Sequence, residues 1–145
     1  MTIYTLGFTQ KNATDFFNLI RSNSIEILID IRLNNKSQLA GFTKGTDLSF
    51  FLKEICNCEY QHCIEFAPTK DILDRYKKQD NDWNEYEKSY IPLIARRGVT
   101  DIFIKQFGAY SKVCLLCSEA SPEKCHRRLL AEFLVQTIDA HIVHL

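Results

Sequence analysis

Strand-like and helix-like patterns alternate along the chain. Short runs typical of strands, apolar on one or both faces, occupy 3–8, 26–31, 59–64, 113–117 and 141–145. The segments between them carry apolar residues every three or four positions, as on the buried face of a helix. This alternation predicts an α/β fold with a mainly parallel sheet.

Helices are expected after Asn12, over 48–55, in two parts over 69–97 with a break at 81–82, over 99–107 and over 122–137. The last helix has Ser121 as its expected N-cap and Pro122 in its first turn. The 69–97 segment is polar, so we interpret it as a helical insertion over the sheet edge or the mouth of a site. The whole chain, 1–145, is interpreted as a single domain.

Connection rules for parallel sheets predict a three-layer, Rossmann-like fold with helices on both faces and the strand order 3-2-1-4-5. In open sheets of this kind, ligands bind beyond the carboxyl ends of the strands where the order of progress reverses. That point lies between the first and fourth strands. We therefore expect the loops at 7–9 and 117–119 to converge, with Asp30 and Arg32 next to them.

The composition restricts the class of protein and the compartment in which we expect it. With 145 residues and 46% hydrophobic content, the chain can bury a core without disulfides. The six cysteines are irregularly spaced, and the chain contains neither a long apolar run nor a secretory leader, so we expect a cytoplasmic protein without a membrane span. Eighteen basic and eighteen acidic residues cancel, which leaves nucleic-acid binding only to a local patch such as Lys124 with Arg127 and Arg128.

The strongest candidate chemistry lies between 117 and 127, where a thiol, a carboxylate, an imidazole and a guanidinium come close in sequence: Cys117, Glu119, His126 and Arg127. A thiol at a strand end that faces a helix N-terminus and cations can ionise and act as a nucleophile. The alternative is an inert buried thiol. Arg127 in turn either binds a carboxylate or phosphate of a ligand or braces the loops by pairing with Glu119 or Asp30.

The other cysteines suggest packing more than metal binding. Cys125 is expected on the apolar side of the last helix, in the core, with a reversible disulfide to Cys117 as the alternative. Cys114 and Cys117 should point to opposite faces of their strand and so cannot share a metal ion. No other spacing favours a metal, and no cofactor motif is evident.

Further ligand contacts are expected from the neighbouring strand ends. Gly7 permits a close backbone approach, and Thr9 can donate to a ligand or cap the loop. Asp30 and Arg32 should point to one side of their strand. The carboxylate of Asp30 suits a ribose hydroxyl or a bracing salt bridge equally well.

Several short motifs occur together in one order: 5–9 (TLGFT), 30–32 (DIR) with Ser37 and Phe42, the tyrosines at 60, 86 and 90, 115–119 (LLCSE) and 125–127 (CHR). In this arrangement the chain resembles the domain of unknown function 488 family over nearly its whole length. The resemblance adds Ser37 and Tyr60 to the expected site. Asn35 stands where the family usually has proline, and 64–68 replaces its usual Leu-Gly-Gly. The resemblance implies a fold and a site rather than a reaction.

We therefore expect an enzyme that acts on an anionic, nucleotide-like or nucleic-acid-derived ligand, with no cofactor and with its reaction type and oligomeric state left open. Cys117, Glu119, His126 and Arg127 would surround the reacting group. The expected ligand contacts are Gly7, Thr9, Asp30, Arg32, Ser37, Tyr60 and Arg128. Two alternatives stay open: a binding module for a nucleotide or nucleic-acid end, and a redox sensor that uses Cys117 and Cys125.

Overall fold

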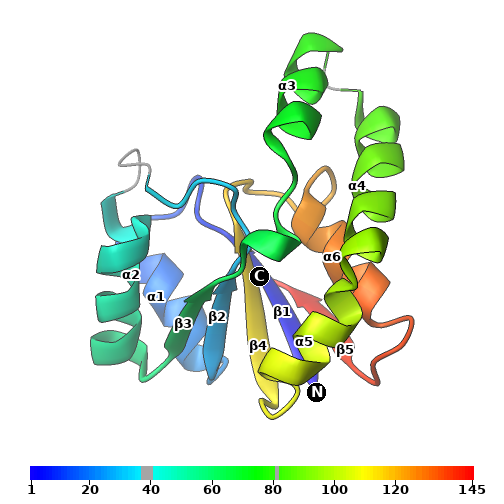
Figure 1. Cartoon of the computed structure of the whole chain (residues 1–145). Helices are drawn as coiled ribbons and strands as arrows, with labels where there is room; N and C mark the ends of the chain where they lie inside the picture. Colours follow the sequence, from blue (N-terminus) through cyan, green and yellow to red (C-terminus); the bar gives the residue numbers. More distant parts are fainter. Residues whose placement is uncertain (37–40, 81) are drawn as a thin grey trace.

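The computed structural model describes residues 1–36, 41–80 and 82–145. Its central sheet contains β1 (Thr2–Gly7), β2 (Ile27–Asp30), β3 (Glu59–His62), β4 (Lys112–Cys117) and β5 (His141–His144). Helices α1 (Ala13–Ser22) and α2 (Gly45–Phe51) lie on one side of the sheet, and α4 (Trp83–Arg97), α5 (Val99–Phe107) and α6 (His126–Leu134) lie on the other (Figure 1). Helix α3 (Lys70–Lys78) lies beyond the strand ends. The predicted α/β architecture is confirmed.

The five strands are all parallel and lie in the order β3-β2-β4-β1-β5. The predicted order 3-2-1-4-5 is corrected at two positions, because β4 lies between β2 and β1. From Val113 to Cys117 every residue of β4 is buried, which suits a central strand paired along both edges. Since β1 and β4 are neighbours in both orders, the predicted meeting of their loops is confirmed: the Thr9 backbone N–H donates to the Ser118 carbonyl at 3.1 Å.

Two hydrophobic clusters cover the two faces of the sheet. Helices α1 and α2 pack on one face, where they meet Leu28, Cys114 and Leu116. Helices α4, α5 and α6 pack on the other face, with Leu115 and Cys117. Cys114 and Cys117 therefore point to opposite faces, as predicted from strand alternation.

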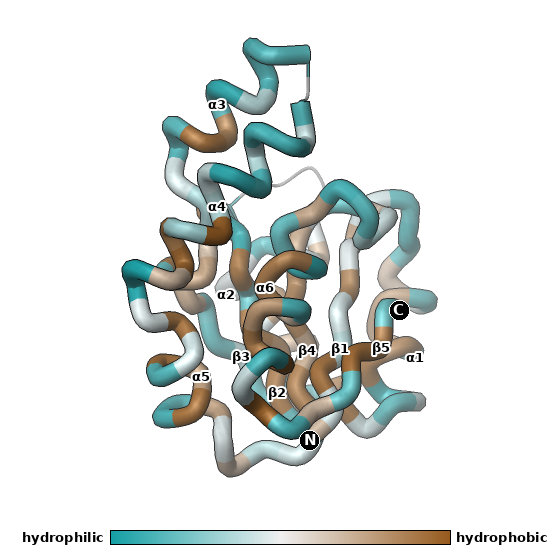
Figure 2. Tube along the Cα trace, turned by 90° about the vertical axis from the view of Figure 1, so that its right-hand side faces the viewer, coloured by the Kyte–Doolittle hydropathy of each residue, from teal (hydrophilic) through white to brown (hydrophobic). Residues whose placement is uncertain are grey.

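Helices α3 and α4 form a hairpin that rises beyond the carboxyl ends of the strands (Figure 1). Its outer end is mostly hydrophilic, whereas hydrophobic residues gather in the sheet and in the helices against it (Figure 2). The inner half of α4 joins the core, because Tyr86, Tyr90 and Ile94 are buried. The 69–97 segment thus contributes to the core as well as to the end of the sheet where the predicted site lies.

The last helix begins four residues later than predicted. Ser121 accepts a hydrogen bond from the Glu123 N–H, but the N-cap of α6 is Cys125, whose sulfur accepts from the Arg127 N–H. The chain from 118 to 125 is a loop that wraps the end of β4 instead of a helical turn. Over the described part of the chain, none of the helices combines the length and hydrophobicity that crossing a bilayer requires.

Candidate functional site

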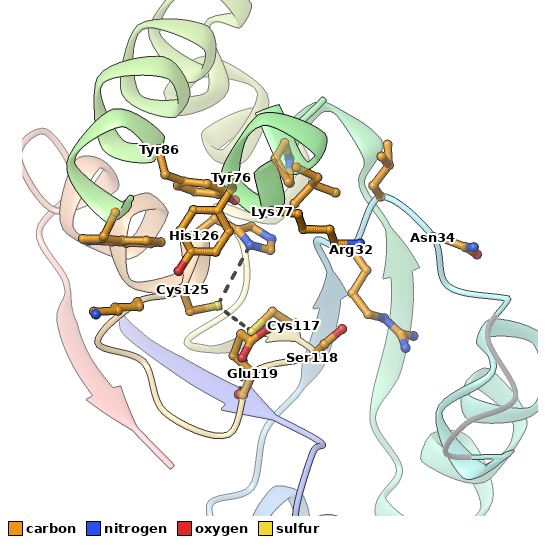
Figure 3. Close-up of a pocket in the computed structure, with 15 residues that line it drawn as sticks. Arg32, Asn34, Tyr76, Lys77, Tyr86, Cys117, Ser118, Glu119, Cys125 and His126 are labelled. Atoms are coloured by element: carbon orange, nitrogen blue, oxygen red, sulfur yellow. Dashed lines mark hydrogen bonds between the residues drawn. The ribbon is translucent and has the colours of Figure 1, made fainter. Parts of the chain in front are cut away.

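A pocket of about 390 Å³ opens beyond the carboxyl end of β4. Its floor contains the ends of β4 and α6, and its wall comes from the α3–α4 hairpin (Figure 3). Those of the predicted site residues that line it are Arg32, Cys117, Glu119 and His126. The lining residues that the predicted site did not include are Leu33, Asn34, Pro68, Leu73, Tyr76, Lys77, Trp83, Tyr86, Ser118, Lys124 and Cys125.

Cys117 lies at the end of β4, between the guanidinium of Arg127 and the thiol of Cys125. Nη1 of Arg127 donates to its Sγ at 2.9 Å, and the Sγ of Cys125 lies 2.7 Å from it. All three side chains are buried, with exposed fractions of 0 to 2%. Because both thiols are free, the cluster is a dithiol held against a guanidinium.

This cluster sets opposite protonation tendencies on the two thiols. Burial by itself would raise the pKa of Cys117, but the hydrogen bond from Cys125 and the charge and hydrogen bond of Arg127 outweigh it and lower that pKa. Burial and the hydrogen bond to Cys117 raise the pKa of Cys125. The proton therefore stays on Cys125, and Cys117 is the member of the pair that ionises.

Arg127 is held by main-chain oxygens and not by a carboxylate. Besides Cys117, Nη1 donates to the Glu119 carbonyl, and Nη2 donates to the Ala120 carbonyl at 3.2 Å. Its Nε is buried and without a partner among the described residues. The predicted pairing with the carboxylate of Glu119 or Asp30 is not formed. Arg127 does not line the pocket, and its predicted role in binding a ligand stays a prediction.

Gly7 makes this arrangement possible on β1. A Cβ atom at Gly7 would collide with the Glu119 carbonyl oxygen and lie 2.7 Å from Nη1 of Arg127. The close backbone approach predicted for Gly7 is therefore made by the 118–125 loop of the protein itself. Thr9 likewise donates its hydroxyl to the Ser118 carbonyl, so it fastens the same loop.

His126 faces the pocket from the first residue of α6 (Figure 3). Its Nε2 lies 3.0 Å from the Ile31 carbonyl, and its Nδ1 lies 4.0 Å from the Cys125 sulfur. Burial and the nearby Arg127 lower its pKa to about 4, although the bond to Ile31 acts in the opposite direction. The imidazole is therefore neutral at pH 7, with Nε2–H as the donor to Ile31 and Nδ1 as an acceptor that faces the Cys125 sulfur.

The hairpin supplies an aromatic wall, defined here as Tyr76, Trp83 and Tyr86. The Trp83 and Tyr86 rings stack at 4.8 Å, and Tyr76 meets Tyr86 edge-on at 5.2 Å. These side chains were not among the predicted site residues. The signal for them was the concentration of Tyr and Trp in a segment otherwise too polar for the core.

Charged side chains surround the pocket mouth. Lys77, Lys124 and Glu119 line it and are exposed. Within the described ranges, neither lysine forms an ion pair. The mouth thus offers two unpaired cations and one carboxylate.

Asp30 and Arg32 form a separate buried network at the end of β2. Arg32 grips Asp30 with two donors, Nε at 2.8 Å and Nη2 at 2.6 Å, and Nη2 also donates to the Thr43 carbonyl at 2.7 Å. Tyr60 donates to Asp30 at 2.7 Å and accepts from the Asn35 amide at 2.9 Å. Arg32 extends away from the two sulfurs (Figure 3). Of the two readings of Asp30, the geometry corresponds to the bracing salt bridge.

Arg128, another predicted ligand contact, does not line the pocket. Arg128 pairs with Glu132 at 3.0 Å and with Glu87 at 3.2 Å, which ties α6 to α4. Ser37 lies outside the described residues. In the described parts of the chain, no group of three or more His, Cys, Asp and Glu side chains is placed to hold a metal ion.

Comparison with known proteins gives a family and no individual relative. Neither the curated proteins nor the solved structures contain a significant match. The family model described as "Domain of unknown function DUF488" matches residues 12–134, which include β2 to β4, the whole of α6 and the whole dithiol cluster. The chain therefore belongs to the DUF488 family.

Proposed function

We propose that this protein is an enzyme that acts on an anionic, nucleotide-like ligand and uses the Cys117 thiolate as its nucleophile. The observation that carries the proposal is the place of Cys117: the residue lines the pocket, and its sulfur accepts a hydrogen bond from Arg127 at 2.9 Å. A thiolate is a far stronger nucleophile than a thiol, and a fixed guanidinium favours the ionised form.

The pocket lining supports the ligand class. Nucleobases stack on aromatic rings, and the aromatic wall presents three of them. Phosphate groups are met by cations, and Lys77 and Lys124 are the unpaired cations of the mouth. Glu119 would repel a phosphate beside it but can accept from a ribose hydroxyl or an exocyclic amine. A ligand with a base, a sugar and a phosphate satisfies all three features.

Each member of the cluster has a distinct task in this proposal. Arg127 is a positioning residue that keeps Cys117 ionised, and Cys125 supports it by donating to the same sulfur. The neutral His126 can accept a proton at Nδ1 from the ligand or from water. Glu119 stands where it can orient a donor group of the ligand. The six free thiols fit a reducing compartment, so we infer a cytoplasmic enzyme.

The test uses a panel of nucleoside mono- and diphosphates and short single-stranded oligonucleotides. Thermal melts report binding, and chromatography with mass spectrometry reports consumption of each compound or a covalent adduct. We expect one class to raise the Tm of the wild type and to be consumed by it. Cys117→Ser should still bind but turn nothing over, whereas Cys56→Ser, outside the pocket, should behave as the wild type.

Three results would contradict the proposal. If no member of the panel shifts the Tm, the ligand class is wrong. If a ligand binds but Cys117→Ser binds and reacts as the wild type does, the thiolate has no chemical role. Binding without any turnover, lost in a Lys77→Gln/Lys124→Gln double variant, would identify a binding module instead of an enzyme.

A further inference from the structure

Cys117 and Cys125 are placed to react with each other as well as with a ligand. Their sulfurs are 2.7 Å apart, and both line the same pocket. We propose that they form a dithiol centre that reduces small hydroperoxides and closes to a reversible disulfide. This activity uses the same Cys117 thiolate as the proposed function, but it requires no nucleotide-like ligand.

The first step is an attack by Cys117 on the hydroperoxide. The thiolate forms an S–O bond as the O–O bond breaks, and the leaving oxygen takes a proton from the solvent, which received the Cys117 proton on ionisation. The products are a Cys117 sulfenic acid and water or an alcohol. The sulfur is oxidised and the peroxide is reduced. Nη1 of Arg127, 2.9 Å from the sulfur, is positioned to donate a hydrogen bond to the oxygen that becomes negative.

The second step is resolution by Cys125. Its sulfur attacks the sulfenic sulfur, the S–S bond forms as the S–O bond breaks, and the Cys125 proton leaves with the hydroxyl group as water. The sulfurs need to move only from 2.7 Å to the roughly 2.05 Å of a disulfide. A small dithiol reductant then restores both thiols by thiol–disulfide exchange.

The remaining cysteines are poor competitors for the peroxide. Burial raises the pKa of Cys58 and of Cys63 to about 12, and it also raises the pKa of Cys56. Cys114 points to the opposite face of the sheet, into the core beneath α1 and α2. Among the described residues that line the pocket, the thiols are those of Cys117 and Cys125. Oxidation should therefore be specific to this pair.

The decisive experiment is made on the reduced wild-type protein, without nucleotide. Hydrogen peroxide is added in slight excess, and intact mass and peptide mapping follow the products. We expect a loss of two hydrogen atoms, a single Cys117–Cys125 cross-link, and full recovery with dithiothreitol. Cys125→Ser should stop at the sulfenic acid, trapped on Cys117 by dimedone. Cys56→Ser, the matched control, should form the same cross-link as the wild type.

The wild-type result decides the matter even where a variant folds poorly. Oxidation at other cysteines first, or over-oxidation of Cys117 without a cross-link, would overturn the dithiol centre. A cross-link that forms equally slowly with peroxide and with air alone would overturn the peroxide reaction. Because no nucleotide is present, failure of the proposed function leaves this result unchanged, and failure here leaves nucleotide turnover to be measured separately.

Discussion

Two buried arginines lie near the ends of neighbouring strands, and they differ in the charge of their partners. Arg32, 4% exposed, forms an ion pair with the carboxylate of Asp30 through two hydrogen bonds. Arg127, fully buried, donates to two carbonyls and to the sulfurs of Cys117 and Cys125, and among the described residues it meets no carboxylate. The charge of Arg32 is compensated by its carboxylate partner, whereas the charge of Arg127 favours the ionised form of Cys117 and helps to lower the pKa of that thiol.

The difference shows how one residue type serves as a brace in one place and as an electrostatic device in the other. A carboxylate beside an arginine is charged at neutral pH in any case, so the pair is static. A thiol can be protonated or ionised near neutral pH, and a neighbouring guanidinium favours the ionised form. The carbonyls that hold Arg127 are dipoles without a net charge. They fix its position without compensating its charge, so the guanidinium still lowers the pKa of the thiol.

The largest effect is expected from Arg32→Met. The substitution strands the buried Asp30 carboxylate, and breaking a buried ion pair from one side costs about 3–5 kcal/mol. The free energy of unfolding, measured in urea, should fall by that amount, while alkylation of Cys117 in the folded protein keeps its wild-type rate. A loss of Cys117 reactivity in this variant would show that the two networks are one.

Arg127→Met should cost less stability but abolish the thiolate. The substitution leaves the Glu119 and Ala120 carbonyls without their donor, and each unpaired carbonyl lowers the free energy of unfolding by about 1–3 kcal/mol. Water that enters the site and binds these carbonyls reduces the loss. Cys117 avoids a stranded charge by taking up a proton. We therefore expect its pKa, followed by thiolate ultraviolet absorbance, to rise above the ordinary value of a thiol.

The matched control for this experiment is Arg128→Met, which removes an adjacent arginine of the same helix. Arg128 pairs with Glu87 and Glu132 near the surface, and such pairs contribute about 0–1 kcal/mol. The thiolate absorbance of the Arg128→Met variant should match that of the wild type. If Arg128→Met raised the pKa of Cys117 as much as Arg127→Met does, general positive charge and not the hydrogen-bonded guanidinium would be responsible.

His126 should give the protein a pH-dependent stability next to the same cluster. Its pKa is about 4 in the folded chain against an ordinary 6.5, so the unfolded chain binds more protons between these values. Stability from this residue is complete above about pH 6.5 and is lost as the pH falls toward 4, by up to about 3 kcal/mol. Urea unfolding across this window measures it.

The variant His126→Gln should flatten that pH dependence, since glutamine does not titrate. His141→Gln, at an exposed site on β5, should keep the wild-type slope. An unchanged slope in His126→Gln would place the proton uptake elsewhere in the molecule.

The smallest effect is expected from Tyr60→Phe. It removes the hydrogen bond to Asp30 and the one from the part-buried Asn35 amide, but Arg32 still holds both carboxylate oxygens. The loss should be about 1.5 kcal/mol, the low end for a bond to a charged group. Tyr110→Phe, which removes an exposed bond to Glu59, is the control and should cost less. A larger loss for Tyr60 would mean that the Asp30 network depends on Tyr60 and not mainly on Arg32.

The local pattern of the chain was enough to predict the fold class and several of the residues that line the pocket. Strand alternation separated Cys114 from Cys117, and the motifs at 117–127 contain Cys117, Glu119 and His126, which lie at the pocket. The helix start was wrong because Ser121 and Pro122 satisfy the local rules for an N-cap, whereas the burial of Arg127 requires the loop to wrap the end of β4. Local propensity carries no information on that requirement.

Contacts between distant segments were decided by the tertiary structure alone. Strand order depends on which strand gains most from the centre of the sheet, and the apolar β4 takes that place. The sequence shows that Arg32 and Arg127 are arginines near strand ends, but it cannot show that one meets a carboxylate and the other meets carbonyls. The charge that a buried guanidinium keeps, and with it the ionisation of Cys117, is set by these partners.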